Sequence, residues 1–291
     1  MDKKLVIVYF ILIMAFFGFY YKYEDFNNFF EVLAYKILPG DDEQKVKFVT
    51  NEDNCDDINH NARQVGDLSD KGKIIFLFND GVDSQYTTGY ELLKSKGYPA
   101  TVAVSPSFVN QDGYMGMKEL TEVYNAGWDV INHTYTHRDL SLLEKDEQKK
   151  EFNTTREWLK SSCYERGSDF VVYPYGAYNT DTIHVLQDEK YSYGITRLEG
   201  VFSNKDKNAE LKTVQMTSDK PVPIIKKMID QAIRDKEVVI LVSHQLNDTI
   251  DQSDQNHFRI KDFERIVNYI YQYREQAEII TVSEWQNTRT K

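Results

Sequence analysis

The chain has 291 residues, a formal net charge of −11 at pH 7 and a sequence pI near 5.1. This acidic balance argues against nucleic acid and against an anionic lipid surface as partners. The roughly 270 residues that follow an apolar amino-terminal run suffice for one large core, and an α/β barrel of that size commonly forms a single domain.

The apolar run, residues 5–21, predicts a transmembrane signal-anchor over residues 1–23. It lies at the short end of the roughly 17–25 residues that a spanning helix needs. No small-x-small cleavage site follows; the run ends instead in the aromatic belt typical of a membrane interface, Phe16, Phe17, Phe19, Tyr20, Tyr21 and Tyr23. Lysines before the run and acidic residues after it favour a single pass through the plasma membrane, with the amino terminus inside. A cleaved signal peptide is the alternative.

Residues 24–72 are expected to form a juxtamembrane segment and stem. Apolar residues recur at helical spacing over 24–38, which indicates an amphipathic helix on the membrane or a continuation of the anchor. Residues 40–70 contain nine acidic against three basic residues and read as a solvated, acidic stem.

Two cysteines, Cys55 and Cys163, cannot make a disulfide framework. One bridge is allowed outside the cell. Because the two residues lie in different segments, we expect two separate thiols, with a single bridge as the alternative.

From residue 73 to the end, short apolar runs alternate with helical segments, which is typical of repeated βα units. The predicted strands are 74–78, 101–104, 128–131, 170–173, 193–196, 212–216, 238–242 and 279–282. The predicted helices are 86–96, 117–125, 145–162, 180–189, 223–236 and 258–276. This pattern predicts a closed or nearly closed parallel barrel over residues 73–291, with an open doubly wound sheet as the alternative.

Polar side chains follow four of these strands directly. They are Asn79 and Asp80, the pair His133 and His137, Pro174 with Tyr175, and Ser243 with His244. In a parallel barrel the carboxyl ends of the strands converge on one face, where such folds carry their chemistry. Residues four apart on a helical turn face the same way, so the two imidazoles of the pair are expected to grip one divalent cation, with Asp80 as a candidate third ligand.

Residues 73–285 resemble the polysaccharide deacetylases with a NodB-homology domain, carbohydrate esterase family 4. The first family motif, Thr-Phe-Asp-Asp-Gly, is similar to residues 77–81, LFNDG. The second, His-Ser/Thr-x-x-His, is matched by residues 133–137, HTYTH. The third resembles residues 173–176, YPYG, and the fifth, Leu-x-His, resembles residues 242–244, VSH. The fourth motif, which carries a tryptophan, is not placed between residues 194 and 217.

The resemblance implies a distorted (β/α)₇ barrel that removes acetyl groups from N-acetylated sugars with a divalent metal. Asp80, His133 and His137 would hold the metal; Zn²⁺ is expected, with Co²⁺ or Ni²⁺ as alternatives. His244 would protonate the leaving amine, and the backbone N–H of Tyr175 would hold the developing oxyanion. Pro174, Tyr175 and Val242 would contact substrate, with Val242 lining the pocket for the acetyl methyl.

The first motif departs from the family pattern at Asn79, where the family has the aspartate that acts as general base. A carboxamide cannot take up that proton. The third motif also lacks the arginine that orients the base in many members. Loss of a general base costs about 10²–10⁴ in rate. Three outcomes are open: Asp83 or another carboxylate replaces the base, the enzyme is slow, or the domain binds glycan without turnover.

Two hypotheses therefore follow. The first is a membrane-anchored, extracytoplasmic N-deacetylase of an N-acetylated polysaccharide, such as a poly-N-acetylglucosamine-like exopolysaccharide or a cell-wall polymer. The second is a catalytically silent metal- and glycan-binding protein that works with polysaccharide synthesis or export proteins. A third idea, cleavage of O-acetyl esters, needs less protonation of the leaving group.

Overall fold

The computed structural model describes residues 55, 58, 68, 70–203, 210–249 and 256–289. The expected anchor, the amphipathic segment and most of the acidic stem lie outside these residues. Among the described helices, none combines the length and apolarity that crossing a membrane requires.

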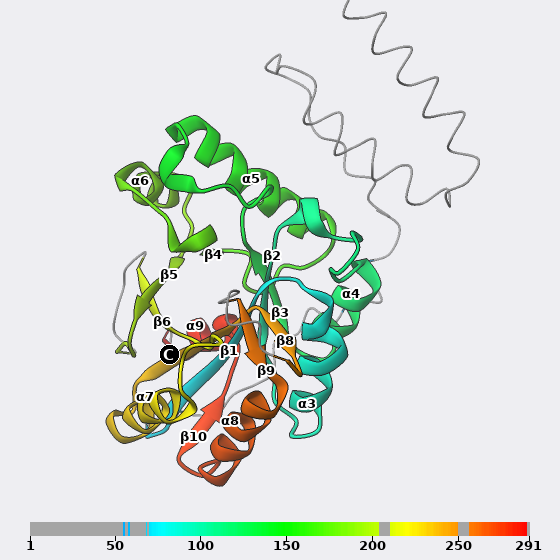
Figure 1. Ribbon diagram of the computed structural model, residues 1–291. Helices are drawn as coiled ribbons and strands as arrows, with labels where there is room; N and C mark the ends of the chain where they lie inside the picture. Colours follow the sequence, from blue (N-terminus) through cyan, green and yellow to red (C-terminus); the bar gives the residue numbers. More distant parts are fainter. Residues whose placement is uncertain are drawn as a thin grey trace, which may run out of the picture. The chain divides into compact units, whose positions relative to one another are not determined.

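Seven parallel strands form a closed ring (Figure 1). They are β1 (Gly72–Asp80), β2 (Thr101–Val104), β3 (Asp129–Asn132), β4 (Phe170–Val172), β5 (Tyr193–Glu199), β6 (Leu211–Gln215) and β7 (Val238–Ser243). Each strand pairs with the next, and β7 pairs back onto β1 from Lys73↔Val238 to Phe78↔Ser243. The predicted closed barrel is confirmed, and the open sheet is excluded.

Strand β1 has three neighbours. One edge pairs with β7, while the other pairs with β10 (Ala277–Ile279) through residues 72–74 and with β2 through residues 77–80. The carboxyl-terminal part of the chain thus extends the barrel wall at the start of β1.

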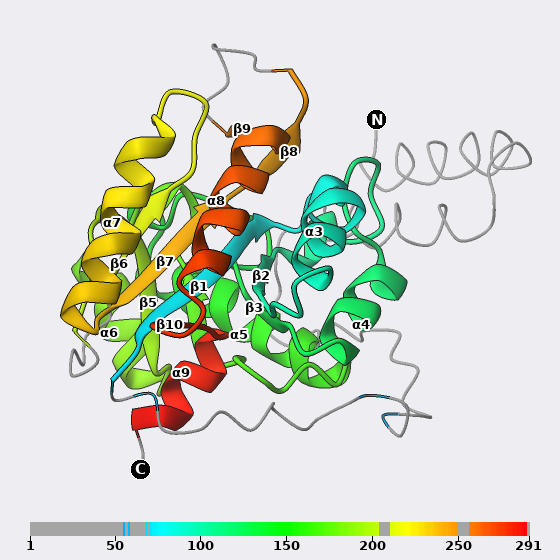
Figure 2. The ribbon, with the colours of Figure 1, turned by 90° about the horizontal axis from the view of Figure 1, so that it is seen from below.

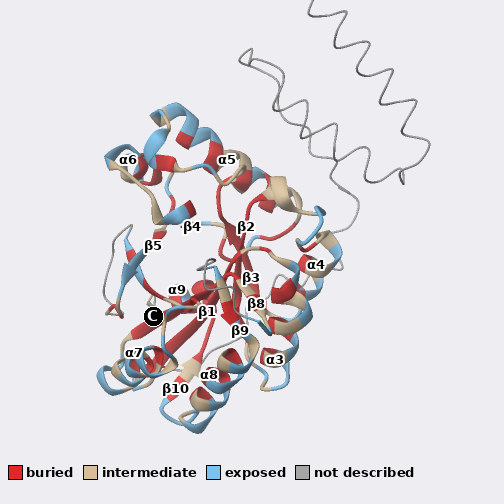
Figure 3. Ribbon diagram, viewed as in Figure 1, coloured by how far each residue is buried: buried red, intermediate tan, exposed pale blue. Residues whose placement is uncertain are grey.

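Alternation along the strands divides the core into two layers. Inward positions of all seven strands meet in one cluster that includes Leu77, Ile131, Ile195 and Val242. Because this cluster draws on every strand of a closed ring, it fills the barrel interior. Outward positions pack instead against the surrounding helices, whose buried faces lie toward the strands in Figure 3.

The helices around the ring are α3 (Glu91–Lys94), α4 (Met117–Asn125), α5 (Lys145–Ser161), α6 (Thr180–Asp188), α7 (Val222–Asp235) and α8 (Ile260–Gln272). They match the predicted helices with shifted ends. The first predicted helix begins as a π-helical segment, η3 (Gln85–Tyr90). The last is shorter than predicted, because the short strand β9 (His257–Arg259) precedes it and pairs with β8 (Gln245–Asn247).

An unpredicted helix, α9 (Val282–Arg289), closes the amino-terminal end of the barrel, opposite β8 and β9 (Figure 2). Its Trp285 is fully buried in the interior cluster and contacts the rings of Phe170 and Phe202. Of the predicted strand 279–282, Ile279 alone lies in a strand, β10, and Val282 already starts this helix, so the prediction is wrong for the other three residues. The open end of the barrel is the one where the strands finish.

Cys55 and Cys163 form a disulfide, with their Cα atoms 5.9 Å apart. The expectation of two separate thiols is wrong. The sequence separation of 108 residues hid the pairing, because the fold brings the stem residue Cys55 to the segment that follows α5.

Candidate functional site

Three potential metal ligands converge at the open end of the barrel. Asp80 ends β1, and His133 and His137 follow β3. Asp80 Oδ1 lies 3.2 Å from Nε2 of His133 and 3.2 Å from Nε2 of His137, and the three ligand atoms lie within 4.8 Å of one another. Asp80 Oδ1 is buried and has no hydrogen-bond partner of good geometry among the described residues. The three ligand atoms can therefore bind one cation between them. Two imidazoles and a carboxylate in this arrangement suit Zn²⁺ or a similar divalent cation.

The loop that carries the two histidines is not the expected helical turn. Thr134 and His137 adopt left-handed backbone conformations, with φ of 64° and 57°. The side chain of Asn132 accepts a hydrogen bond from the N–H of Thr134 at 2.8 Å, and the Thr134 hydroxyl accepts one from the N–H of His137 at 3.1 Å. Short polar side chains compete with helical hydrogen bonds in this way. The resulting bend still brings the two imidazoles together, with ring centroids 4.8 Å apart.

Neighbouring backbone groups fix the orientation of His133. Its Nδ1 lies 2.8 Å from the carbonyl oxygen of Val172, at the end of β4. If Nδ1 carries the proton and donates it there, Nε2 keeps its lone pair for a cation. The hydroxyl of Ser105 donates to the backbone carbonyl of His133 at 2.9 Å.

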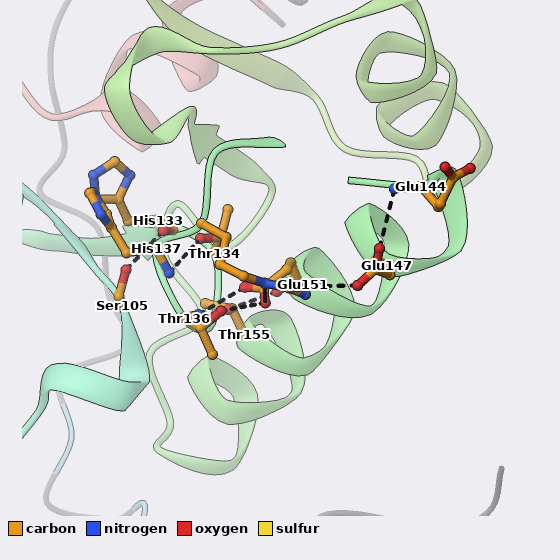
Figure 4. Close-up of polar contacts among 10 residues, drawn as sticks. Ser105, His133, Thr134, Thr136, His137, Glu144, Glu147, Glu151 and Thr155 are labelled. Atoms are coloured by element: carbon orange, nitrogen blue, oxygen red, sulfur yellow. Dashed lines mark hydrogen bonds and ion pairs between the residues drawn. The ribbon is translucent and has the colours of Figure 1, made fainter. Parts of the chain in front are cut away.

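Glu151 of α5 supports the same loop through hydrogen bonds to Thr136 (Figure 4). Its buried carboxylate accepts a hydrogen bond from the N–H of Thr136 at 2.8 Å and another from the Thr136 hydroxyl at 2.5 Å. Arg138 Nε donates to it at 3.3 Å. The residues on either side of His137 are thus tied to one buried carboxylate.

The electrostatics of the cluster favour the forms that bind a cation. Burial alone would raise the pKa of Asp80, but the imidazoles of His133 and His137 outweigh it and hold that pKa well below its usual range. Burial lowers the pKa of His133, against the attraction of Asp80. An ionised carboxylate beside a neutral imidazole is the state that ligates a metal.

His244 follows β7 and lies in the pocket beside this cluster. Burial lowers its pKa to about 4, although the charge of Asp80 opposes the shift. Its imidazole is therefore neutral near pH 7. Val242, two residues earlier on the inward side of β7, is buried and lines the same pocket.

Asn79 occupies the pocket where the family motif has its general base. The residue is 6 % exposed, and its Oδ1 has no hydrogen-bond partner among the described residues. Asp83 does not replace it: the residue is exposed, its N–H is bonded to Gly113 O at 2.9 Å, and it does not line the pocket. Of the carboxylates that the structure describes, Asp80 alone lines the pocket.

Tyr175 and Pro174 lie in the 3₁₀ segment η6 (Pro174–Gly176) that follows β4. Tyr175 has a φ of 60°, is 63 % exposed, and places its ring edge-on against His137 with centroids 4.8 Å apart. It lines the pocket. Pro174 is buried and does not line it, so the structure gives Pro174 a supporting position in place of the expected contact with substrate.

The sequence profile described as polysaccharide deacetylase matches residues 67–194. Over these residues the chain is similar to the polysaccharide deacetylase family. The chain is 23% identical over 171 residues to the poly-beta-1,6-N-acetyl-D-glucosamine N-deacetylase of Staphylococcus aureus, covering 54% of this chain and 59% of the relative. It is 24% identical over 130 residues to the protein YxkH of Bacillus subtilis, covering 45% and 46%.

These matches span about half the length of the curated relatives. Among solved structures, the chain is similar to the Xyl-CE4 domain of a multidomain xylanase from the hindgut metagenome of Trinervitermes trinervoides. The TM-score is 0.51 at 17% identity, covering 76% of this chain and 92% of that domain. This likeness concerns the fold.

Several residues that line this pocket were not predicted from sequence. They are Thr196 and Arg197 of β5, Gln215 of β6, and Asn256 before β9. The available signal was the alternation along β6, where Gln215 lies two residues beyond the buried Thr213. Alternation does not place Arg197, because the register of β5 is irregular between Ile195 and Glu199.

Proposed function

We propose that this chain is a divalent-metal-dependent N-deacetylase of an N-acetylated amino-sugar polysaccharide. The observation that carries the proposal is the convergence of Asp80, His133 and His137 beside His244 at the open end of the barrel. The name of the Staphylococcus aureus relative supports a poly-N-acetylglucosamine-like polymer as substrate. A cell-wall polymer of N-acetylated sugars fits the same chemistry.

Asp80, His133 and His137 would hold the cation, with Zn²⁺ as the expected ion. When bound, such a cation supplies Lewis-acid activation of water and of the amide carbonyl. In the reaction, water adds to the carbonyl carbon, the C–N bond breaks, and acetate and a free amine leave.

The chain's own residues supply the proton transfers and the fit. His244 is neutral in the free protein, because burial lowers its pKa to about 4. As general acid it would receive the proton that the attacking water loses and pass it to the leaving amine. The N–H of Tyr175 would donate to the developing oxyanion. Val242 offers an apolar contact for the acetyl methyl. Asn79 contributes a polar amide to the pocket but cannot accept the proton.

A second candidate function is glycan binding without turnover, as part of a polysaccharide synthesis or export assembly. Asn79 favours it, because the described pocket wall contains no carboxylate free to act as base. Cleavage of O-acetyl esters is a further possibility for the same site. In either case we propose a plasma-membrane location, with residues 1–23 as a single-pass anchor, residues 24–72 as the stem and residues 73–291 outside the cytoplasm.

The test is acetate release from N-acetylglucosamine oligomers by the purified full-length chain loaded with Zn²⁺ or Co²⁺. We expect activity that disappears in His133→Ala. The variant Asn79→Asp measures the missing base: a gain of about 10²–10⁴ would show that the parent lacks one. A parent that binds the oligomers but releases no acetate supports the glycan-binding function. Ester and amide substrates run side by side decide between O- and N-deacetylation.

A further inference from the structure

Arg197 stands on the pocket wall formed by β5. Ile195, two residues earlier, belongs to the barrel interior, and the register of β5 becomes irregular between Ile195 and Glu199. The residue lines the same pocket as Asp80 and His244 and is exposed. A cationic residue therefore lines the space in which a sugar would bind.

The stem of Arg197 is held by a close contact with Gly176. A Cβ atom at Gly176 would lie 2.6 Å from Arg197 Cγ and 2.8 Å from its Cβ, and the φ of Gly176 is +69°. Only glycine lets the arginine stem lie this close to the backbone. Because Gly176 directly follows Tyr175, the stem of Arg197 lies beside the proposed oxyanion site.

No carboxylate in the described part of the chain neutralises Arg197. Glu199, two residues further along β5, is paired with Lys220 at 2.8 Å. Glu210 accepts a hydrogen bond from the Tyr178 hydroxyl at 2.6 Å. Asp80 lies between the two imidazoles.

An arginine remains charged at every pH that the protein meets, and its planar fork matches carboxylate and phosphate groups. The charge acts within the site, since it contributes to the lowered pKa of His244 after the larger effect of burial. A polymer made cationic by deacetylation would be repelled here, whereas an anionic one would be attracted.

We propose that Arg197 is a specificity-determining residue that binds an anionic substituent, a carboxylate or a phosphate, on the acetamido sugar or its neighbour. The preferred substrate is then an anionic N-acetylated polymer, in preference to neutral poly-N-acetylglucosamine. The preference for an anionic substrate in catalysis rests on the function proposed above. The preference for an anionic ligand in binding does not depend on that function.

The experiment compares three probes on the zinc-loaded full-length chain by NMR titration. They are the neutral disaccharide of N-acetylglucosamine, a disaccharide that carries the lactyl carboxylate of N-acetylmuramic acid, and N-acetylglucosamine 6-phosphate. We expect one charged probe to bind about 10-fold tighter than the neutral one, as a charge-assisted hydrogen bond allows. The charged probe with the lower dissociation constant identifies the anion, carboxylate or phosphate, that Arg197 binds.

The variants Arg197→Gln, Arg197→Lys and Arg234→Gln complete the design. The glutamine variant should bring the ratio of dissociation constants to about 1, and the lysine variant should keep part of the preference. Arg234 is an exposed arginine of α7 paired with Asp235, and its variant should bind as the parent does.

Equal binding of neutral and charged probes by the parent overturns the proposal, as does a preference that survives in Arg197→Gln. Acetate release is measured on the same samples. Tighter binding of a charged probe without acetate release would refute the proposed deacetylase function and support the role of Arg197. Acetate release without tighter binding of a charged probe would refute the role of Arg197 and support the deacetylase function.

Discussion

The side-chain amide of Gln85 donates a hydrogen bond to the backbone carbonyl of His244, with 2.8 Å between Nε2 and oxygen. The same nitrogen donates to the backbone carbonyl of Asn79. Gln85 is fully buried at the start of η3, so one side chain ties the ends of β1 and β7 together. Both strand ends carry residues of the proposed site.

We expect Gln85→Leu to lower the free energy of unfolding by about 1–3 kcal/mol, because two buried carbonyls lose their donor. Chemical denaturation measures the change. The exposed Gln111 also donates to a backbone carbonyl, Ser107 O at 2.6 Å, and Gln111→Leu should stay within about 0.5 kcal/mol of the parent. Equal effects of the two substitutions on the free energy of unfolding would contradict this role of Gln85.

Glu151→Gln should weaken zinc binding by about 10–100-fold, the usual cost of losing a group that orients a ligand. The carboxamide can accept only part of the hydrogen bonds that Thr136 and Arg138 now donate to Glu151. Competition with a chelator of known affinity measures the change. Glu147 also forms an ion pair with Arg138, but this pair is exposed to solvent. Glu147→Gln therefore serves as the control and should leave the zinc affinity nearly unchanged. An unchanged affinity in Glu151→Gln would show that the loop holds His137 without it.

The lowered pKa of His244 predicts a pH dependence of stability in the metal-free protein. Burial brings the folded pKa to about 4, below the unfolded value of 6.5. Below pH 6.5 the unfolded state therefore binds more protons, and stability is lost as the pH falls toward 4. Between about pH 7.5 and about pH 4.5, the parent should lose roughly 2–3 kcal/mol more than His244→Asn does. The exposed His184→Asn should behave as the parent, and parallel curves for parent and His244→Asn would refute the shift.

The disulfide predicts a redox dependence of stability. Removing it by Cys55→Ser, or reducing the parent, should lower the free energy of unfolding by about 2–5 kcal/mol. Denaturation with and without reductant measures this change, and the Cys55→Ser variant should show no response to reductant. Two titratable thiols in the native, oxidised parent would mean that Cys55 and Cys163 do not pair.

The barrel was predictable because short apolar runs alternate with helical segments from residue 73 onward. Asp80, His133, His137 and His244 were predictable because each comes directly after such a run. In a closed parallel barrel the carboxyl ends of the strands lie on one face, so residues that follow different strands come together there. Val242 was named from the family resemblance, and it lines the same pocket.

The remaining features depend on contacts that a linear pattern does not contain. The histidine loop bends because Asn132 and Thr134 capture backbone N–H groups, which spacing alone does not disclose. Asp83 is exposed, and its backbone N–H is bonded to Gly113 on another loop. The disulfide joins residues 108 positions apart. Arg197 lay within the segment that the family motifs left unassigned.

Strand β1 also constrains the order in which the molecule can assemble. Its partners β2, β7 and β10 come from the start, the late part and the end of the domain. Pairings between such distant segments form slowly, since the entropy of closing long loops must be lost first. A ribosome-bound chain that lacks β7 and β10 cannot complete the ring, so we expect it to expose apolar edges until synthesis is almost finished. Truncations that remove β10 should accordingly aggregate, and this domain should depend on chaperones more than a helical protein of its length does.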